Sequence, residues 1–145
     1  MINIGQLTTQ VVMALSESSG QLIGDGIAPK GGGWLSGQPN VSAFVPYSVL
    51  IFQGAQLAEP AWSYNEQIRA WTTEWRVTSF GGSREQCDWM ASAAREGVDD
   101  CIGQDFDAYR VSMAQWRALG GMMRDDSIDP PMWSVSDTFT LRCDA

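Results

Sequence analysis

Three kinds of side chain in this sequence could do chemistry: a serine that follows two glycines, three cysteines, and two groups of aspartates. The turn Gly81-Gly82-Ser83 precedes a helix-like segment, whose free N–H groups could bind a phosphate. A P-loop needs a longer loop that ends in Gly-Lys-Ser/Thr, and a dinucleotide-binding turn needs three spaced glycines. Glu85 and Asp88 would also repel an anion from the first helical turn. The turn therefore predicts a helix start and not a phosphate site.

The cysteines and the missing histidines narrow the chemistry further. Cys87, Cys101 and Cys143 cannot all pair, and none belongs to a Cys-x-x-Cys motif, so we expect free thiols in a reducing compartment. Cys87 is expected on the buried face of a helix as a small hydrophobic residue. The chain has 0 histidines, which removes the commonest general base and the commonest zinc ligand. We therefore expect neither hydrolytic nor transition-metal chemistry.

The aspartates could bind a hard cation. They form two groups, Asp99, Asp100, Asp105 and Asp107, and Asp125, Asp126 and Asp129. Neither group has the spacing of an EF-hand loop, which also needs a glycine and a final glutamate at fixed positions. We expect solvated surface charge, and a calcium site at the first group stays open as an alternative.

Length and charge indicate one soluble domain. A chain of 145 residues can bury a sufficient core without a disulfide or a metal ion. Its 17 acidic and 9 basic residues give a net charge of −8, and the basic residues form no patch of the kind that binds nucleic acid. The sequence also has no apolar run of about 18 residues and no signal-peptide pattern, so we expect neither membrane insertion nor export.

Two helices and four strands must position these groups. An apolar stripe predicts a helix over residues 4–18, and a second helix follows Ser83. Gln86 is expected to bond back to the Ser83 N–H in a capping box. Period-2 patterns predict strands over residues 44–53, 67–80, 109–119 and 133–142. The second strand is unusually long, and we expect its excess to project beyond the sheet.

The order helix, strand, strand, helix, strand, strand predicts an α+β fold. We expect a single domain over residues 1–145, with a hairpin in each strand pair, a small mixed or antiparallel four-stranded sheet, and both helices packed on it. Glycine-rich residues 20–40 are expected to form a long loop, and residues 120–131 a second loop.

Several segments resemble the tail terminator proteins of long-tailed actinobacterial phages. They are Gly24-Asp-Gly26, Gly31-Gly-Gly-Trp34, Gly37-Gln-Pro39, Phe44-Val-Pro-Tyr47, Ser79-Phe-Gly-Gly-Ser-Arg-Glu-Gln-Cys-Asp-Trp89 and Arg124-Asp-Asp-Ser-Ile-Asp-Pro-Pro-Met-Trp-Ser-Val-Ser-Asp-Thr-Phe139. The likeness covers most of the chain after the first 20 residues and consists of structural turns and strands, without a catalytic motif.

The resemblance implies a structural virion protein without an active site, and hence no enzyme activity, no catalytic residues and no cofactor. Such a subunit forms a ring, typically a hexamer, which caps the tail tube, stops its polymerisation and joins it to the head connector. The implied partners are further copies of the chain, the tail tube protein and the connector or stopper protein, and genomic DNA passes through without specific binding. The implied location is the head-proximal end of the virion tail, and the host cytoplasm during assembly.

The family supplies no residue motif for these contacts. The candidate interface residues therefore rest on apolar character within expected loops, and they are Trp34, Leu35, Trp62, Met122, Met123 and Ile128. Two other classes stay open. One is a different head-to-tail connector, such as a stopper or head completion protein. The other is a small ligand-binding or enzymatic domain, which a pocket beside Gly81 and Gly82 or beside the aspartates would favour.

Overall fold

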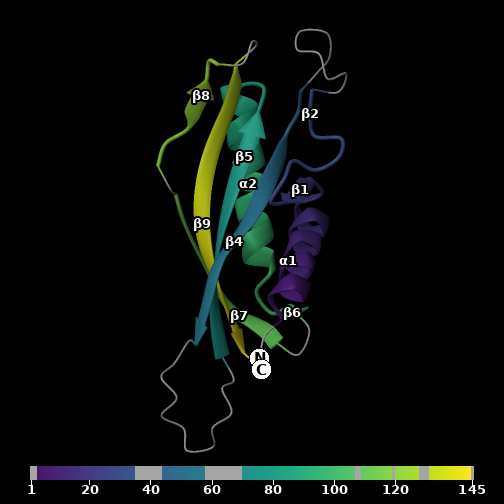
Figure 1. Cartoon of the computed structure of the whole chain (residues 1–145), viewed down its shortest axis with the longest axis vertical. Helices are drawn as coiled ribbons and strands as arrows, with labels where there is room; N and C mark the ends of the chain where they lie inside the picture. Colours follow the sequence, from purple (N-terminus) through teal and green to yellow (C-terminus); the bar gives the residue numbers. More distant parts are fainter. Residues whose placement is uncertain are drawn as a thin grey trace, which may run out of the picture.

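A strongly twisted sheet with two helices on one face forms the molecule (Figure 1). The structure is a computed structural model, and it describes residues 3–34, 44–57, 70–106, 109–118, 120–127 and 131–144. The 7-stranded sheet has the order β1-β4-β5-β9-β7-β6, and β8 also pairs with β9. Its strands are β1 (Leu22–Asp25), β4 (Tyr47–Leu57), β5 (Ala70–Gly81), β6 (Asp105–Phe106), β7 (Tyr109–Ala118), β8 (Met123–Asp125) and β9 (Met132–Asp144). A separate 2-stranded sheet joins β2 (Gly33–Trp34) to β3 (Phe44–Val45).

Four long antiparallel strands, β4, β5, β9 and β7, form the body of the sheet. Paired residues share a face, so one row joins Phe52, Trp75, Phe139 and Trp116 on the face that the helices cover. We call this the helix-side face, and the opposite face the open face. The β5 register with β9 runs from Ala70 to Gly81, so all 12 residues of β5 are paired.

Helix α1 (Ile4–Ser19) confirms the first predicted helix. The Asn3 side chain accepts a hydrogen bond from the Gln6 N–H, and Gly20 ends the helix with a φ of 67°, a left-handed conformation that glycine adopts without strain. Leu7, Val11 and Leu15 are buried and belong to the main core.

Helix α2 (Arg84–Asp100) begins at the predicted serine cap. The Gln86 N–H donates to Ser83 Oγ at 3.2 Å, as a cap requires. The reciprocal bond differs from the prediction, because Gln86 Oε1 accepts from the Gly82 N–H at 2.8 Å, one residue earlier than expected. The chain leaves β5, crosses the helix-side face as α2, and reaches β7 on the far side of β9.

The main core lies between this face and the helices. Trp75 lies in this core and is 0% exposed, and its ring packs edge-on against Phe52 and stacks on Phe139. Met90, Ala94 and further α2 side chains cover it, as their helical spacing predicted. No helix in the described part of the chain is long and apolar enough to cross a membrane.

Several sequence-based expectations about the sheet were wrong, although the α+β class holds. The sheet is 7-stranded and not four-stranded, because β1, β6 and β8 have only 4, 2 and 3 residues and carry no periodic pattern of their own. The expected loop over residues 20–40 contains β1 and β2, and the expected loop over residues 120–131 contains β8. The excess length of β5 does not project, because β9 is long enough to pair with all of it.

Candidate assembly surface

A buried ion pair ties α2 to the sheet beside β7. Asp137 lies on the helix-side face of β9 and is 1% exposed. Both of its oxygens accept hydrogen bonds from Arg95 of α2, at 3.1 Å from Nε and 3.0 Å from Nη2. The same guanidinium lies over the ring of Trp116, with Cζ 4.7 Å from the ring centroid. One arginine therefore neutralises a buried carboxylate and holds an aromatic side chain of β7 in place.

The outer part of β7 next to this cluster carries two exposed apolar side chains, Met113 on the open face and Trp116 on the helix-side face. Met113 and Trp116 are each 44% exposed. The Val111 N–H donates to Gln104 O at 2.9 Å, and Val111 O accepts from the Gly103 N–H at 2.8 Å, so both groups point away from β9. Beyond Val111, no described strand pairs with this side of β7.

The second half of β4 forms a similar edge on the other side of the sheet. β1 pairs in parallel with β4 only from Tyr47 to Leu50. From Ile51 to Leu57, β4 pairs with β5 alone among the strands that the structure describes. Unpaired edges of this kind are templates for pairing with another chain.

The open face is polar. Thr78 and Ser136 share a hydrogen bond of 2.9 Å, and Arg76 Nη2 donates weakly to Ser136 Oγ at 3.4 Å, while Arg76 Nε is buried without a described partner. A concavity of about 690 Å³ lies over the four long strands, and its lining includes Gln53, Glu74, Gln115, Arg117, Thr138 and Thr140. The lining also includes Asp99 of α2 and three helix-side residues of β7 and β9, Ala114, Trp116 and Phe139. Its two carboxylates, Glu74 and Asp99, come from opposite sides of the sheet, whereas a pair for acid and base catalysis would have to flank one substrate.

The glycine turn is a packing device. A Cβ atom on Gly81 would lie 2.4 Å from the Cys87 backbone nitrogen, so the close approach of β5 to α2 requires glycine there. The Gly82 N–H donates to Gln86 Oε1 at 2.8 Å, so it is not free to bind an anion. These contacts support the structural interpretation of the turn over a phosphate site.

The cysteines are buried thiols. Burial, with smaller contributions from neighbouring charges, raises the pKa of Cys87 to about 11 and that of Cys101 to about 12. Burial likewise raises the pKa of Cys143 to about 11. Since the thiolate is the reactive form, these groups are not nucleophiles at neutral pH.

The aspartates do not converge. Asp99 and Asp100 lie in the last turn of α2, where Ser18 Oγ donates to Asp100. The pKa of Asp105 is lowered because Arg110 donates to its carboxylate, at 2.8 Å from Nε. Within the described ranges no group of acidic or sulfur side chains could hold a metal ion, and Asp107 and Asp129 lie outside those ranges.

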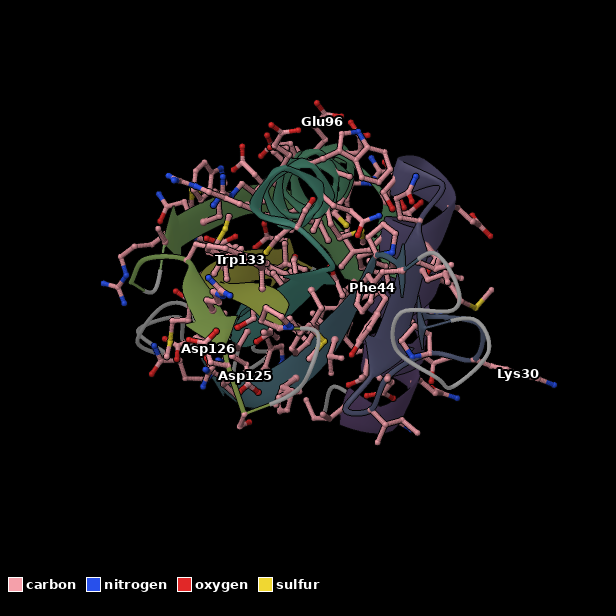
Figure 2. All side chains as sticks on the ribbon, turned by 90° about the horizontal axis from the view of Figure 1, so that it is seen from above. Lys30, Phe44, Glu96, Asp125, Asp126 and Trp133 are labelled. Carbon is pink, nitrogen blue, oxygen red and sulfur yellow. The ribbon has the colours of Figure 1, made fainter. Side chains whose placement is uncertain are left out.

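The second aspartate group lies on β8 and the turn after it. The pKa of Asp125 is lowered because the hydroxyl and the N–H of Ser127 both donate to it. Asp126 pairs with Arg124 at 2.7 Å. In Figure 2, Asp125 and Asp126 project on the opposite side of the molecule from Glu96, which points outward from α2. Asp100, Asp105, Asp125 and Asp126 are therefore engaged by side chains nearby.

The interface residues proposed from the sequence stay a prediction. Met123 is 70% exposed on β8, whereas Met122 is half-buried against Cys87, Ala91 and Val135. The backbone of Trp34 lies in β2, and its side chain is not described. The remaining candidates lie outside the described residues, and they are Leu35, Trp62 and Ile128.

Sequence reasoning missed the cluster that the fold brings together. Arg95, Trp116 and Asp137 come from α2, β7 and β9, and nothing local links them. One signal was available, because Asp137 occupies an inward position between Val135 and Phe139 in a period-2 pattern. A charged residue at such a position requires a buried partner of opposite charge.

Comparison with solved structures gives a match of fold. No protein-family model and no curated protein sequence matches the chain. Among solved structures, the fold is similar to that of a chain from the virion of a native gene transfer agent particle, with a TM-score of 0.51 and 14% identity. The match covers 95% of this chain and 92% of the other. At this identity the likeness concerns the fold.

Proposed function

We propose that this chain is a structural subunit of a virion, and specifically a tail terminator whose ring caps the tail tube and joins it to the head connector. The observation that carries the proposal is the fold match across nearly the whole of both chains, because the matching chain is a component of a virion particle. The sequence resemblance to tail terminators, which uses the turns around Gly81 and the segment before Phe139, supports the narrower role.

The chemistry of the described residues fits a role in assembly. The thiols are protonated, the helix cap is satisfied by its own side chains, and Asp100, Asp105, Asp125 and Asp126 are bound by side chains nearby. A long strand edge with exposed Met113 and Trp116 is free in the described chain. Edges and aromatic side chains of this kind serve contacts between proteins. The net charge of −8 supports a channel through which DNA passes without being held.

Particles assembled without this protein provide the test. Growth of a tail tube stops only when a subunit caps its open end, because each ring presents the same surface to the next. Loss of the protein should therefore give filled heads without attached tails, together with tubes of abnormal length, in negative-stain micrographs. Expression of the wild-type chain in trans should restore normal particles. Free tails of normal length beside untailed heads would instead identify a stopper, and the terminator role would be abandoned.

A further inference from the structure

We propose that the subunits of this ring join by strand pairing, in which the outer edge of β7 in one copy adds to the second half of β4 in the next copy. The inference rests on the proposed ring and names its contact. Two edges of one sheet are unpaired within the described residues, Ser112–Ala118 of β7 and Ile51–Leu57 of β4. Each has 7 residues, a common strand length.

The two edges lie at the same level of the sheet. Successive pairings connect Ile51 to Arg117 through Arg76 and Thr138, and they connect Leu57 to Val111 through Trp71 and Cys143. A copy placed beside β7 in the same orientation therefore presents its β4 edge to the β7 edge of its neighbour.

The strand directions also agree. β4 and β9 run one way, and β5 and β7 run the other, because each neighbouring pair is antiparallel. When β4 of the next copy adds to β7, the alternation continues across the subunit boundary. Such a contact joins two different surfaces and can repeat around a closed ring.

The free backbone groups can be assigned to residues. In a strand, side chains and backbone N–H groups both alternate with period 2, so residues on one face direct their N–H groups to the same side. The Val111 N–H points away from β9. A register shift between Val111 and Met113 inserts one extra residue into β7, so Ala114 and Trp116 lie on the same helix-side face as Val111. Their N–H groups therefore point outward as well.

The same reasoning applies to β4. Leu50 O accepts from the Gly26 N–H at 2.9 Å, so it points away from β5. Phe52 shares the helix-side face with Leu50, and Ala55 joins it because a register shift between Phe52 and Gly54 inserts one extra residue. Both residues therefore direct their backbone groups the same way as Leu50. Pairing would place Phe52 of one copy beside Trp116 of the next, and aromatic pairs across strands stabilise sheets.

Proline substitutions test the contact, because proline removes one N–H group. Ala114→Pro and Ala55→Pro each delete an outward N–H and leave the bonds to β9 and β5 intact. The matched controls are Ala114→Val and Ala55→Val, which add similar volume and retain the N–H. Far-UV circular dichroism and urea unfolding establish that each variant is folded, and sedimentation of the full chain across a wide concentration range gives its assembly state.

The wild type and both valine variants should form rings, and each proline variant alone should raise the dissociation constant of self-association at least tenfold. A mixture of the two proline variants should form a 1:1 heterodimer, because Ala55→Pro retains an intact β7 edge and Ala114→Pro retains an intact β4 edge. The heterodimer cannot grow, since both of its remaining edges carry proline.

Other outcomes would overturn the inference. A dimer of Ala55→Pro alone would indicate symmetric pairing of β7 with β7. Rings formed by both proline variants, or a wild type that stays monomeric, would exclude the strand contact. These results are separate from the proposed function, because the length of tails made without the protein tests the terminator role whatever the subunit contact.

Discussion

Removal of Arg95 should destabilise the fold more than removal of its partner Asp137. Asp137 is 1% exposed and its carboxylate is bound by Arg95 at both oxygens, whereas the Arg95 side chain is 26% exposed. Arg95→Met leaves a charge in the core that cannot reach water. Asp137→Asn leaves an arginine that can turn toward solvent and that retains one oxygen acceptor.

The magnitudes follow from this asymmetry. Loss of one partner from a buried ion pair costs about 3–5 kcal/mol, which we expect for Arg95→Met. Loss of a hydrogen bond to a charged group costs about 1.5–3 kcal/mol, which we expect for Asp137→Asn. The contact of Arg95 with Trp116 adds about 0.5–1 kcal/mol at a partly exposed site, too little to reverse the order. The double variant should be more stable than Arg95→Met alone, because its core contains no unpaired charge.

Urea unfolding followed by circular dichroism measures these differences. With a slope of about 2 kcal/mol per molar urea, Arg95→Met should lower the midpoint by about 1.5–2.5 M. Arg95→Lys is the control that retains the charge and loses the bidentate hydrogen bonds to the carboxylate. Its urea midpoint should lie between those of the wild type and Arg95→Met. If adding Asp137→Asn lowers the stability of Arg95→Met further, the destabilisation does not come from an unpaired carboxylate.

Four more outcomes test the local structure. Ser83→Ala should cost about 0.5–2 kcal/mol in urea unfolding, because the Gln86 N–H loses its acceptor, while Ser83→Asp should be tolerated; equal loss in both would show that the cap is not the cause. Gly81→Ala should lose soluble protein, because its Cβ would lie 2.4 Å from the Cys87 nitrogen, and the control Gly54→Ala, with no atom within 4 Å, should express normally. The folded protein should resist iodoacetamide at pH 8, and rapid labelling without urea would contradict protected thiols. Folding raises the pKa of the thiols from about 9 to about 11–12, so the unfolded chain loses these protons at a lower pH than the folded protein does. The free energy of unfolding should therefore be unaffected by the thiols below pH 9 and should fall as the pH rises from 9 toward 11–12, which urea midpoints at each pH would measure. The protected cysteines are Cys87, Cys101 and Cys143.

The sequence predicted the elements whose signals are local. The helical stripe with its glycine stop gave α1 within one residue, and the serine after two glycines gave the start of α2. The four long strands appeared through period-2 patterns because each buries one face. Both predicted strand pairs were also correct. β4 pairs with β5, and β7 pairs directly with β9, although the short strand β8 lies between them in the sequence.

The short strands were missed for a physical reason. β1 contains Gly24 and Asp25, which are typical of turns, and it pairs in parallel with a strand more than 20 residues later. Gly24 is needed there because a Cβ would lie 2.0 Å from Ile27 O. A glycine required by tertiary packing cannot be distinguished from a turn glycine by composition.

The assembly surface was only partly predictable. The strand over residues 109–119 was identified from its residue pattern. Its position at the edge of the sheet was not, because the insertion of β9 between β5 and β7 depends on pairing across more than 50 residues. The interface residues predicted from the sequence were therefore apolar residues in expected loops, whereas the contact proposed from the structure is a strand edge.

Folding and assembly can be separated at the Arg95 cluster. Arg95 positions Trp116, and the proposed contact places that ring beside Phe52 of the next copy. The variant that combines Arg95→Met with Asp137→Asn should recover much of the folding stability, but its Trp116 has lost the guanidinium that fixed it. We therefore expect this variant to be folded and to self-associate several-fold more weakly than the wild type in sedimentation experiments. The Ala114→Val variant serves as the control, since it leaves the cluster intact. Assembly at wild-type affinity would show that the orientation of Trp116 does not contribute to the subunit contact, and the pairing would then depend on backbone hydrogen bonds alone.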